Sequence, residues 1–157
     1  MSAALKLTIV PDTGVGELIG DKPALIPPGK YHLRMTHWQT AIMWGRSRKL
    51  ILHFTVCDMG HCGVKLERYY NIERIIGNPA INGRFKASWR SDLMHEYCTL
   101  LPPPLRPDRI CLERLKPLLI VGNVKTVTAN AKQKRIPDAL HYSVVSELLH
   151  VEAGARP

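Results

Sequence analysis

The segment from residue 49 to residue 57 alternates between apolar and polar side chains, as a half-buried β-strand requires. A stretch rich in aromatic and β-favouring residues, 30–44, precedes it, and the segment 45–48 (Gly-Arg-Ser-Arg) lies between the two. Strand, turn and strand in this order predict a β-hairpin, which commits this part of the chain to an antiparallel sheet. The apolar face of the second strand comprises Leu50, Leu52, Phe54 and Val56.

Three further strands and one helix are predicted beyond this hairpin. Ser91 is expected to cap the helix, in which apolar residues recur at helical spacing until Pro102 ends it. The resulting order matches the OB-fold, so we expect a mainly β protein: a five-stranded OB-like Greek-key barrel with one helix between strands 3 and 4. An α+β sandwich with the same element order is the alternative. The further strands are 64–72, 118–128 and 140–151, with a polar turn at 129–137 between the last two.

The size of the chain predicts a single domain. With 157 residues and 45% hydrophobic positions it can bury a sizeable core. We expect an N-terminal lead-in at 1–25, the OB-like domain at 26–151 and a loose C-terminal tail at 152–157. The N-terminus lacks the layout of a signal peptide and no stretch reaches the roughly 20 apolar residues of a membrane span, which favours a cytoplasmic protein with reduced thiols and no membrane contact.

Basic charge is concentrated in two parts of the chain. The formal net charge is +9, which favours a polyanionic partner. The windows 22–57 and 114–137 each contain six Lys or Arg and no Asp or Glu. The bases are densest at the two predicted hairpin turns, and in an OB-fold the corresponding loops flank the face that holds oligonucleotides. The two turns are therefore predicted to line one cationic groove; an ordinary solvated surface is the competing interpretation.

Aromatic side chains would distinguish single strands from duplex, because unstacked bases bind to aromatic faces. Arg34, Trp38 and Trp44 share one parity of the 30–44 strand, so both indoles could stand beside an arginine unless a bulge shifts the register. Burial of each indole in the core is the alternative, and Trp89 is a weaker stacking candidate. The predicted nucleic-acid-binding residues are Arg34, Trp38, Trp44, Arg46, Arg48, Lys49, Lys125, Lys132, Lys134 and Arg135.

Several segments resemble a known family. They are Pro-Pro-Gly-Lys-Tyr (27–31), Leu-His-Phe-Thr-Val-Cys-Asp (52–58), Gly-His-Cys-Gly-Val-Lys-Leu (60–66), Tyr-Tyr-Asn-Ile (69–72) and Leu-Ile-Val-Gly-Asn-Val-Lys-Thr-Val (119–127). Their layout, over roughly 26–149, is similar to that of OB-fold single-stranded-DNA-binding proteins of phages and integrating mobile elements. The resemblance implies sequence-tolerant binding of single strands during replication, recombination or transfer of such an element. It assigns no individual contact residue.

Metal binding and catalysis are less well supported. His53 and Cys57 lie about 13 Å apart along one strand, too far to share an ion, at roughly 3.3 Å per residue. His61 and Cys62 could meet His95 and Cys98 only if the helix packs on that turn, and paired Cys-x2-Cys knuckles are absent. No nucleophile, phosphate-loop, metalloprotease or dinucleotide motif occurs, and the acids are spread singly. We therefore expect no metal, no cofactor and no enzyme activity.

The function expected from the sequence is non-catalytic binding of single-stranded DNA, with RNA as an open alternative. The competing class is a basic protein-binding module, or an inhibitor that acts on an acidic host protein or a ribonucleoprotein. The same basic turns would serve such a module, but it would not need aromatic stacking on bases. Whether the chain forms a homo-oligomer is left open.

Overall fold

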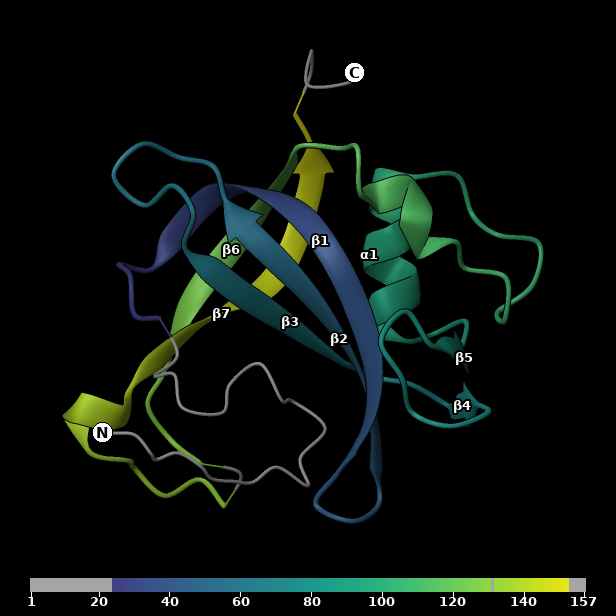
Figure 1. Cartoon of the computed structure of the whole chain (residues 1–157), viewed down its shortest axis with the longest axis horizontal. Helices are drawn as coiled ribbons and strands as arrows, with labels where there is room; N and C mark the ends of the chain where they lie inside the picture. Colours follow the sequence, from purple (N-terminus) through teal and green to yellow (C-terminus); the bar gives the residue numbers. More distant parts are fainter. Residues whose placement is uncertain (1–23, 131, 153–157) are drawn as a thin grey trace, which may run out of the picture.

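The computed structural model describes residues 24–130 and 132–152 (Figure 1). Most of the predicted lead-in and tail, 1–23 and 153–157, lies outside the described residues, so the domain division stays a prediction. The described elements are β1 (Gly29–Met43), β2 (Ser47–Val56), β3 (Lys65–Asn71), β4 (Arg74–Ile76), β5 (Arg84–Lys86), α1 (Asp92–Leu100), the 3-10 turn η2 (Leu112–Leu115), β6 (Ile120–Val127), the 3-10 turn η3 (Asp138–Leu140) and β7 (Tyr142–Val151).

Five strands form one antiparallel sheet in the order β3-β2-β1-β6-β7, and β4 pairs only with β5. The predicted mainly β class is confirmed, with α1 between the third and fourth strands of the large sheet. The first turn, predicted at 45–48, begins one residue earlier and is one residue shorter, at Trp44–Arg46. The short strands β4 and β5 were not predicted. No helix in the described part of the chain has the length and apolarity to cross a bilayer.

Strand β1, the central strand of this sheet, is strongly curved and forms an arch (Figure 1). Its first residues pair with β6 and the remainder pairs with β2. Met35 lies opposite Phe54 and His37 opposite His53, so Thr36 is the extra residue of a β-bulge. The bulge reverses the inward and outward alternation: Leu33 and Met35 face the core before it, and Trp38 faces the core after it.

The main core lies between the concave face of this sheet and α1. Ser91 caps the helix as predicted, because its hydroxyl accepts the Met94 N–H at 3.1 Å. One side of the helix packs against the core through Leu93 and Tyr97. The side chains in this core that are almost fully buried include Leu33, Leu50, Leu52, Phe54, Val56, Leu93, Leu112, Leu115, Ile120 and Val145.

A buried carboxylate bridges the two edge strands of the sheet. Strands β3 and β7 approach one another, but no ladder joins them among the described residues. Glu96 of α1 lies at this seam, where its Oε1 accepts the Tyr70 hydroxyl at 2.6 Å and the Leu148 N–H at 3.0 Å. Arg68 of β3 pairs with the same carboxylate. Burial, with the nearby Glu96, raises the pKa of Tyr70 well above its usual value, so the phenol keeps its proton.

Candidate nucleic-acid interface

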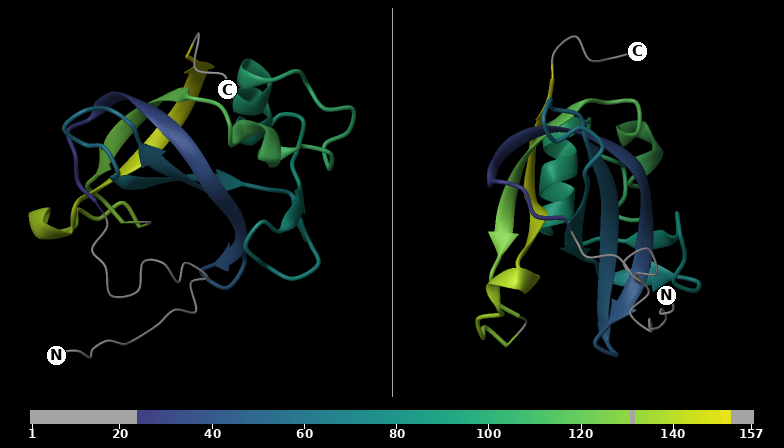
Figure 2. Two further views of the ribbon diagram at one scale, coloured as in Figure 1. Left: turned by 45° about the horizontal axis from the view of Figure 1, so that its top comes forward. Right: turned by 60° about the vertical axis from the view of Figure 1, so that its left-hand side comes forward.

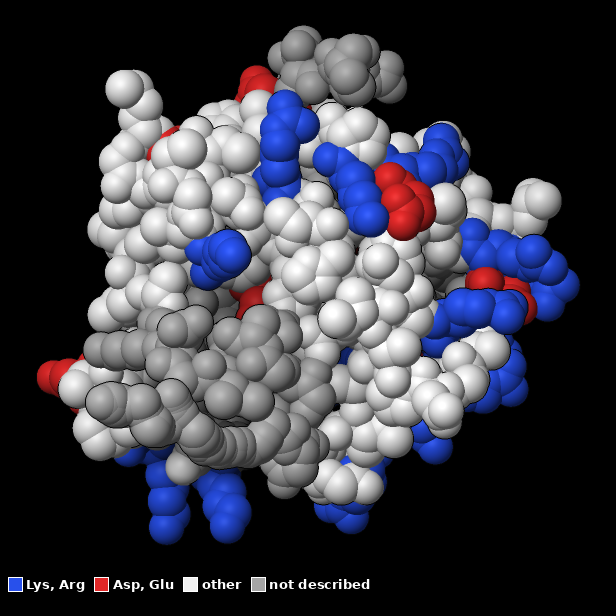
Figure 3. Space-filling view, in the orientation of Figure 1, with Lys and Arg blue, Asp and Glu red and all other residues white. Residues whose placement is uncertain are grey.

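The β1–β2 hairpin and the β6–β7 hairpin project from the same end of the molecule. The end of β1 continues into the first hairpin, and the start of β1 pairs with β6, which leads to the second. Because β1 arches, both tips point the same way in Figure 1 and in the right-hand view of Figure 2. Figure 3 shows Lys and Arg side chains protruding along this lower edge near both tips. That the tips line one groove stays a prediction.

Trp44 occupies an unusual position at the first tip. Its side chain is 66% exposed, and its φ of 53° lies in the left-handed region that bulky side chains rarely adopt. Gly45 follows with a φ of 78°, and the Arg46 N–H donates to the Met43 carbonyl at 3.2 Å. A turn of this kind favours Asn or Gly where Trp44 stands. The indole therefore lowers the stability of the fold in two ways: its apolar surface is exposed to water, and its backbone is strained.

One cation lies beside this indole, and two more are exposed at the same tip. The Lys49 ammonium lies 5.4 Å from the centroid of the Trp44 ring and also donates to the Asn71 carboxamide. Arg46 and Arg48 are exposed at the same tip. The arrangement offers a flat aromatic surface for a base and, beside it, positive charge for the adjoining phosphates.

The second tip is shaped by Asn130. Its side-chain oxygen accepts the N–H groups of Lys132 at 2.9 Å and Lys134 at 3.1 Å, which folds the loop tightly on itself. The Lys132 and Lys134 side chains are exposed there. Arg135 is also exposed, but it pairs with Asp138 at 3.1 Å, so part of its charge is already balanced. Lys125 is exposed on β6, the strand that leads to this loop.

Two predicted contact residues are not brought to the tips. The Thr36 bulge turns Trp38 toward the core, where only 8% of it is exposed and its indole N–H donates to the Gly83 carbonyl at 2.9 Å. Arg34 lies opposite Thr55 and donates to the Pro117 carbonyl at 3.1 Å. It is separated from Trp44 by ten residues of β1, about 30 Å of strand. The predicted pair of indoles beside an arginine is therefore wrong: of Trp38 and Trp44, Trp44 is the exposed one, and Trp89, the weaker stacking candidate, is 52% exposed.

A polar cluster on the other face of the sheet was not predicted as a unit. His37 stacks on His53 with ring centroids 4.2 Å apart, and His53 Nε2 lies 2.8 Å from the Gln39 carboxamide oxygen. Burial, and then the neighbouring His37, lowers the pKa of His53 to about 4. The ring is thus neutral at pH 7, and its 3.5 Å approach to Glu67 is a polar contact rather than an ion pair. The sequence held one sign of this cluster: His53 alternates with the apolar residues of its strand and so lies on the face opposite the core.

The structure assembles no metal site from the residues considered as ligands. Among residues 24–130 and 132–152, no group of three or more His, Cys, Asp or Glu side chains is placed to hold an ion. The four cysteines, at positions 57, 62, 98 and 111, are free and exposed.

The chain's own residues are the basis for inferring its function. Comparison with protein-family models, with curated proteins and with solved structures finds no match for this chain.

Proposed function

We propose that this chain binds single-stranded DNA, largely without sequence preference, through the tips of its two long hairpins. The observation that carries the proposal is Trp44, an exposed indole held in a strained turn, with Lys49 beside its ring and two exposed arginines, Arg46 and Arg48, at the same tip. Within the fold the ring gains only its contact with Lys49, whereas a stacked base would cover it. RNA is the alternative ligand, because neither stacking nor phosphate contacts distinguish the two sugars.

The sheet topology supports an OB-like barrel as the scaffold. The strand order β3-β2-β1-β6-β7, with α1 between β3 and β6, leaves a single seam between β3 and β7. The OB-fold is a partly open five-stranded Greek-key barrel, and it binds oligonucleotides between the loops that join its first two and its last two strands. These loops correspond to the β1–β2 and β6–β7 tips. In this proposal Glu96 takes the place of a backbone ladder at the seam.

The energetics divide between the aromatic ring and the cations. Stacking of one base on Trp44 is worth roughly 1–3 kcal/mol, whatever the base. Each phosphate contact adds about 0.7 to the slope of log K against log salt on single strands. Arg135 should contribute less than its neighbours because Asp138 already pairs with it. The proposed phosphate contacts are Arg46, Arg48, Lys49, Lys132, Lys134 and Arg135.

The resemblance to single-stranded-DNA-binding proteins of phages and mobile elements extends this proposal to a process. Sequence-tolerant binding would serve replication, recombination or transfer of such an element, in which exposed strands of any sequence must be covered. No catalytic step is included, since the chain would act by binding alone.

The test measures the binding of oligo-dT to three proteins at a series of salt concentrations, with the quenching of tryptophan fluorescence as the signal. The first is the unaltered chain, the second carries Arg46→Ser, Arg48→Ser and Lys49→Ser, and the third carries the control Lys65→Ser, an exposed lysine on β3. We expect salt-sensitive quenching, a slope lower by about 2 in the triple variant, and an almost unchanged slope in the control.

Two outcomes would contradict the proposal. Emission that stays constant through the titration would exclude a base on Trp44 and favour the basic protein-binding module. An equal loss of slope from Lys65→Ser alone would show that net charge, rather than the hairpin tip, attracts the strand.

A further inference from the structure

The face of β1, β2 and β3 that points away from the main core is itself buried. This outer face is built around Gln39 and Ala41 of β1, Ile51 and His53 of β2, and Tyr69 of β3. Ile51 has no exposed surface, and Gln39, Ala41 and His53 are buried as well. Burial this complete indicates that a further layer packs on the sheet, as is usual for an apolar sheet face.

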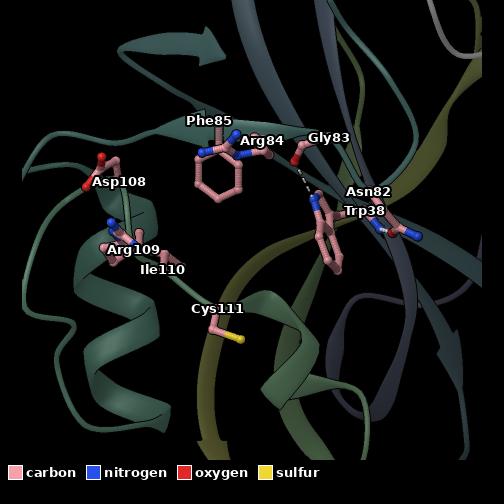
Figure 4. Close-up of a pocket in the computed structure, with 9 residues that line it drawn as sticks. All are labelled: Trp38, Asn82, Gly83, Arg84, Phe85, Asp108, Arg109, Ile110 and Cys111. Atoms are coloured by element: carbon pink, nitrogen blue, oxygen red, sulfur yellow. Dashed lines mark hydrogen bonds between the residues drawn. The ribbon is translucent and has the colours of Figure 1, made fainter. Parts of the chain in front are cut away.

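The alternation of side chains after the bulge in β1 determines which residues reach the outer face. Trp38 points to the main core, where its indole N–H donates to the Gly83 carbonyl (Figure 4). Its successors Gln39 and Ala41 are therefore one and three residues out of phase with it and lie on the opposite side. Ala41 packs there with Ile51 in a small apolar cluster that is separate from the main core.

The described elements that pack on this sheet lie on its other side. The helix α1 and the turn η2 contribute to the main core, for instance through Leu93 and Leu115. In contrast, the apolar side chains of the outer cluster all belong to the three strands themselves, as far as residues 24–130 and 132–152 are concerned. The layer that covers the cluster is therefore assigned to another length of chain.

Residues 1–23 join the described chain close to this face. The Ser143 N–H, at the start of β7, donates to the Ala24 carbonyl at 2.8 Å and fixes the point from which the segment departs. Burial, and then the charge of Glu67, raises the pKa of the adjacent Tyr142, so the departure point is near the β3 side of the outer face. Twenty-three residues can extend over about 75 Å, at roughly 3.3 Å per residue, which is ample to cross three strands.

The sequence of this segment matches the chemistry of the outer face and of the neighbouring hairpin tips. Leu5, Leu7 and Ile9 alternate with other residues, so an extended segment has one apolar side for the cluster around Ile51. The segment contains three acids and two bases, in a chain whose net charge is +9. Its carboxylates are complementary to the cations of the tips. The acids are Asp12, Glu17 and Asp21.

We propose that residues 1–23 dock on the outer face of the same molecule, and that single-stranded DNA must displace them. The inference rests on the proposed function, because in an OB-like barrel this face lies between the two loops that hold an oligonucleotide. The apolar side of the segment packs on Ala41 and Ile51, and its carboxylates take the place of phosphates at the tips. A site that is open for only a fraction of the time binds more weakly by that fraction, so the segment lowers the affinity for DNA.

A photo-cross-link in the full-length chain without DNA tests the docking. Benzoylphenylalanine at position 7 joins the segment to whatever lies beside it, and mass spectrometry identifies the joined peptides. We expect cross-links within one chain to peptides from 37–53 or 65–71, and their loss at saturating oligo-dT. The control places the same group at position 105, where an exposed leucine stands between α1 and η2, and should give no cross-link to these peptides.

Binding of oligo-dT tests the competition. Leu5→Ser with Leu7→Ser and Ile9→Ser removes the apolar side without a change in charge, so the affinity should rise about five-fold or more while the slope of log K against log salt stays the same. The matched control, Thr8→Ser with Val10→Ser, alters the other side of the same segment and should change the affinity less than about two-fold.

Carboxylate variants test the electrostatic part. Neutralising the three acids of the segment should raise the affinity more than neutralising three exposed acids elsewhere, although both variants gain the same net charge. The first variant is Asp12→Asn with Glu17→Gln and Asp21→Asn, and the second is Glu73→Gln with Glu113→Gln and Glu147→Gln.

Three outcomes would overturn the proposal. Cross-links to none of the β1–β3 peptides would leave the face to another protein, and cross-links that join two chains would assign it to a second copy. An unchanged affinity after loss of the apolar side would exclude competition with DNA. The cross-link is measured without DNA, so it succeeds or fails independently of strand binding; oligo-dT that binds to none of these variants would contradict the proposed function instead.

Discussion

Replacement of Trp44 by Asn should weaken strand binding without weakening the fold. The change places Asn-Gly, the pair that tight hairpin turns favour, at positions 44 and 45. Asn tolerates a φ of 53° better than a bulky residue does, which relieves roughly 1 kcal/mol of strain. The lost contact with Lys49 costs about 0.5–1 kcal/mol at an exposed site. The free energy of unfolding should therefore stay within about 1 kcal/mol of its original value.

Binding should respond in a different way. Loss of a stacked base removes roughly 1–3 kcal/mol, which corresponds to a decrease in affinity of about 5- to 150-fold. The charge is unchanged, so the slope of log K against log salt should stay the same. Anisotropy of a labelled oligo-dT measures both quantities, and urea denaturation measures stability. Trp89→Asn is the matched control, since Trp89 is 52% exposed but belongs to the segment between β5 and α1 rather than to either hairpin, and less than a two-fold change is expected there.

A clear loss of stability with unchanged affinity would refute this reasoning, because Trp44 would then be a structural residue of the turn. An equal loss of affinity in the Trp89 variant would refute it as well, since any exposed indole would then serve.

Further predictions concern two ionisable contacts. Glu96→Gln should lower the free energy of unfolding by about 3–5 kcal/mol in urea denaturation, since it leaves the buried Arg68 without its counter-ion. The control Glu113→Gln, in an exposed pair with Lys116, should cost less than about 1 kcal/mol. Similar losses in both variants would show that Glu96 does not stabilise the seam between β3 and β7. The hydrogen bond from His32 to Asp58, followed by that to Glu152, raises the pKa of His32 above 6.5, so its contribution to stability is complete below that value and is lost as pH rises through the raised pKa. The difference in unfolding midpoint between the unaltered chain and His32→Gln should therefore shrink from about pH 6 to about pH 8.5, and a difference that grows would show that the sign is wrong.

The strands of the large sheet could be predicted from the sequence, but the two short strands and the bulge in β1 could not. Alternation around Leu52 and the polar turns on either side were enough to predict the strands, because a half-buried strand must repeat every two residues. Strands β4 and β5 have three residues each, too few for a period to be visible. The Thr36 bulge could not be predicted either, since Met35-Thr36-His37 contains no Gly or Pro to mark it.

The bulge explains why half of the aromatic prediction failed. A single extra residue reverses the side on which every later side chain of the strand lies, so Trp38 became part of the core. Trp44 is exposed for another reason: it follows the last residue of β1 and lies in the turn.

The seam between β3 and β7 illustrates the same limit. Glu96 stands on a helix whose spacing predicted a half-buried face, but nothing in that spacing showed that its carboxylate would contact both edge strands. Long-range polar contacts of this kind depend on the packing of the whole sheet.

The central claim is that the two hairpin tips contact one strand together. Photo-cross-linking of a single oligonucleotide that carries 5-iodouracil along its length, followed by mass spectrometry of the cross-linked peptides, tests this most directly. We predict cross-links at Trp44 and in the segment 132–135 of the same protein molecule, and their joint loss when either set of tip cations is replaced by Ser. Cross-links confined to one tip, or to neither, would contradict the claim.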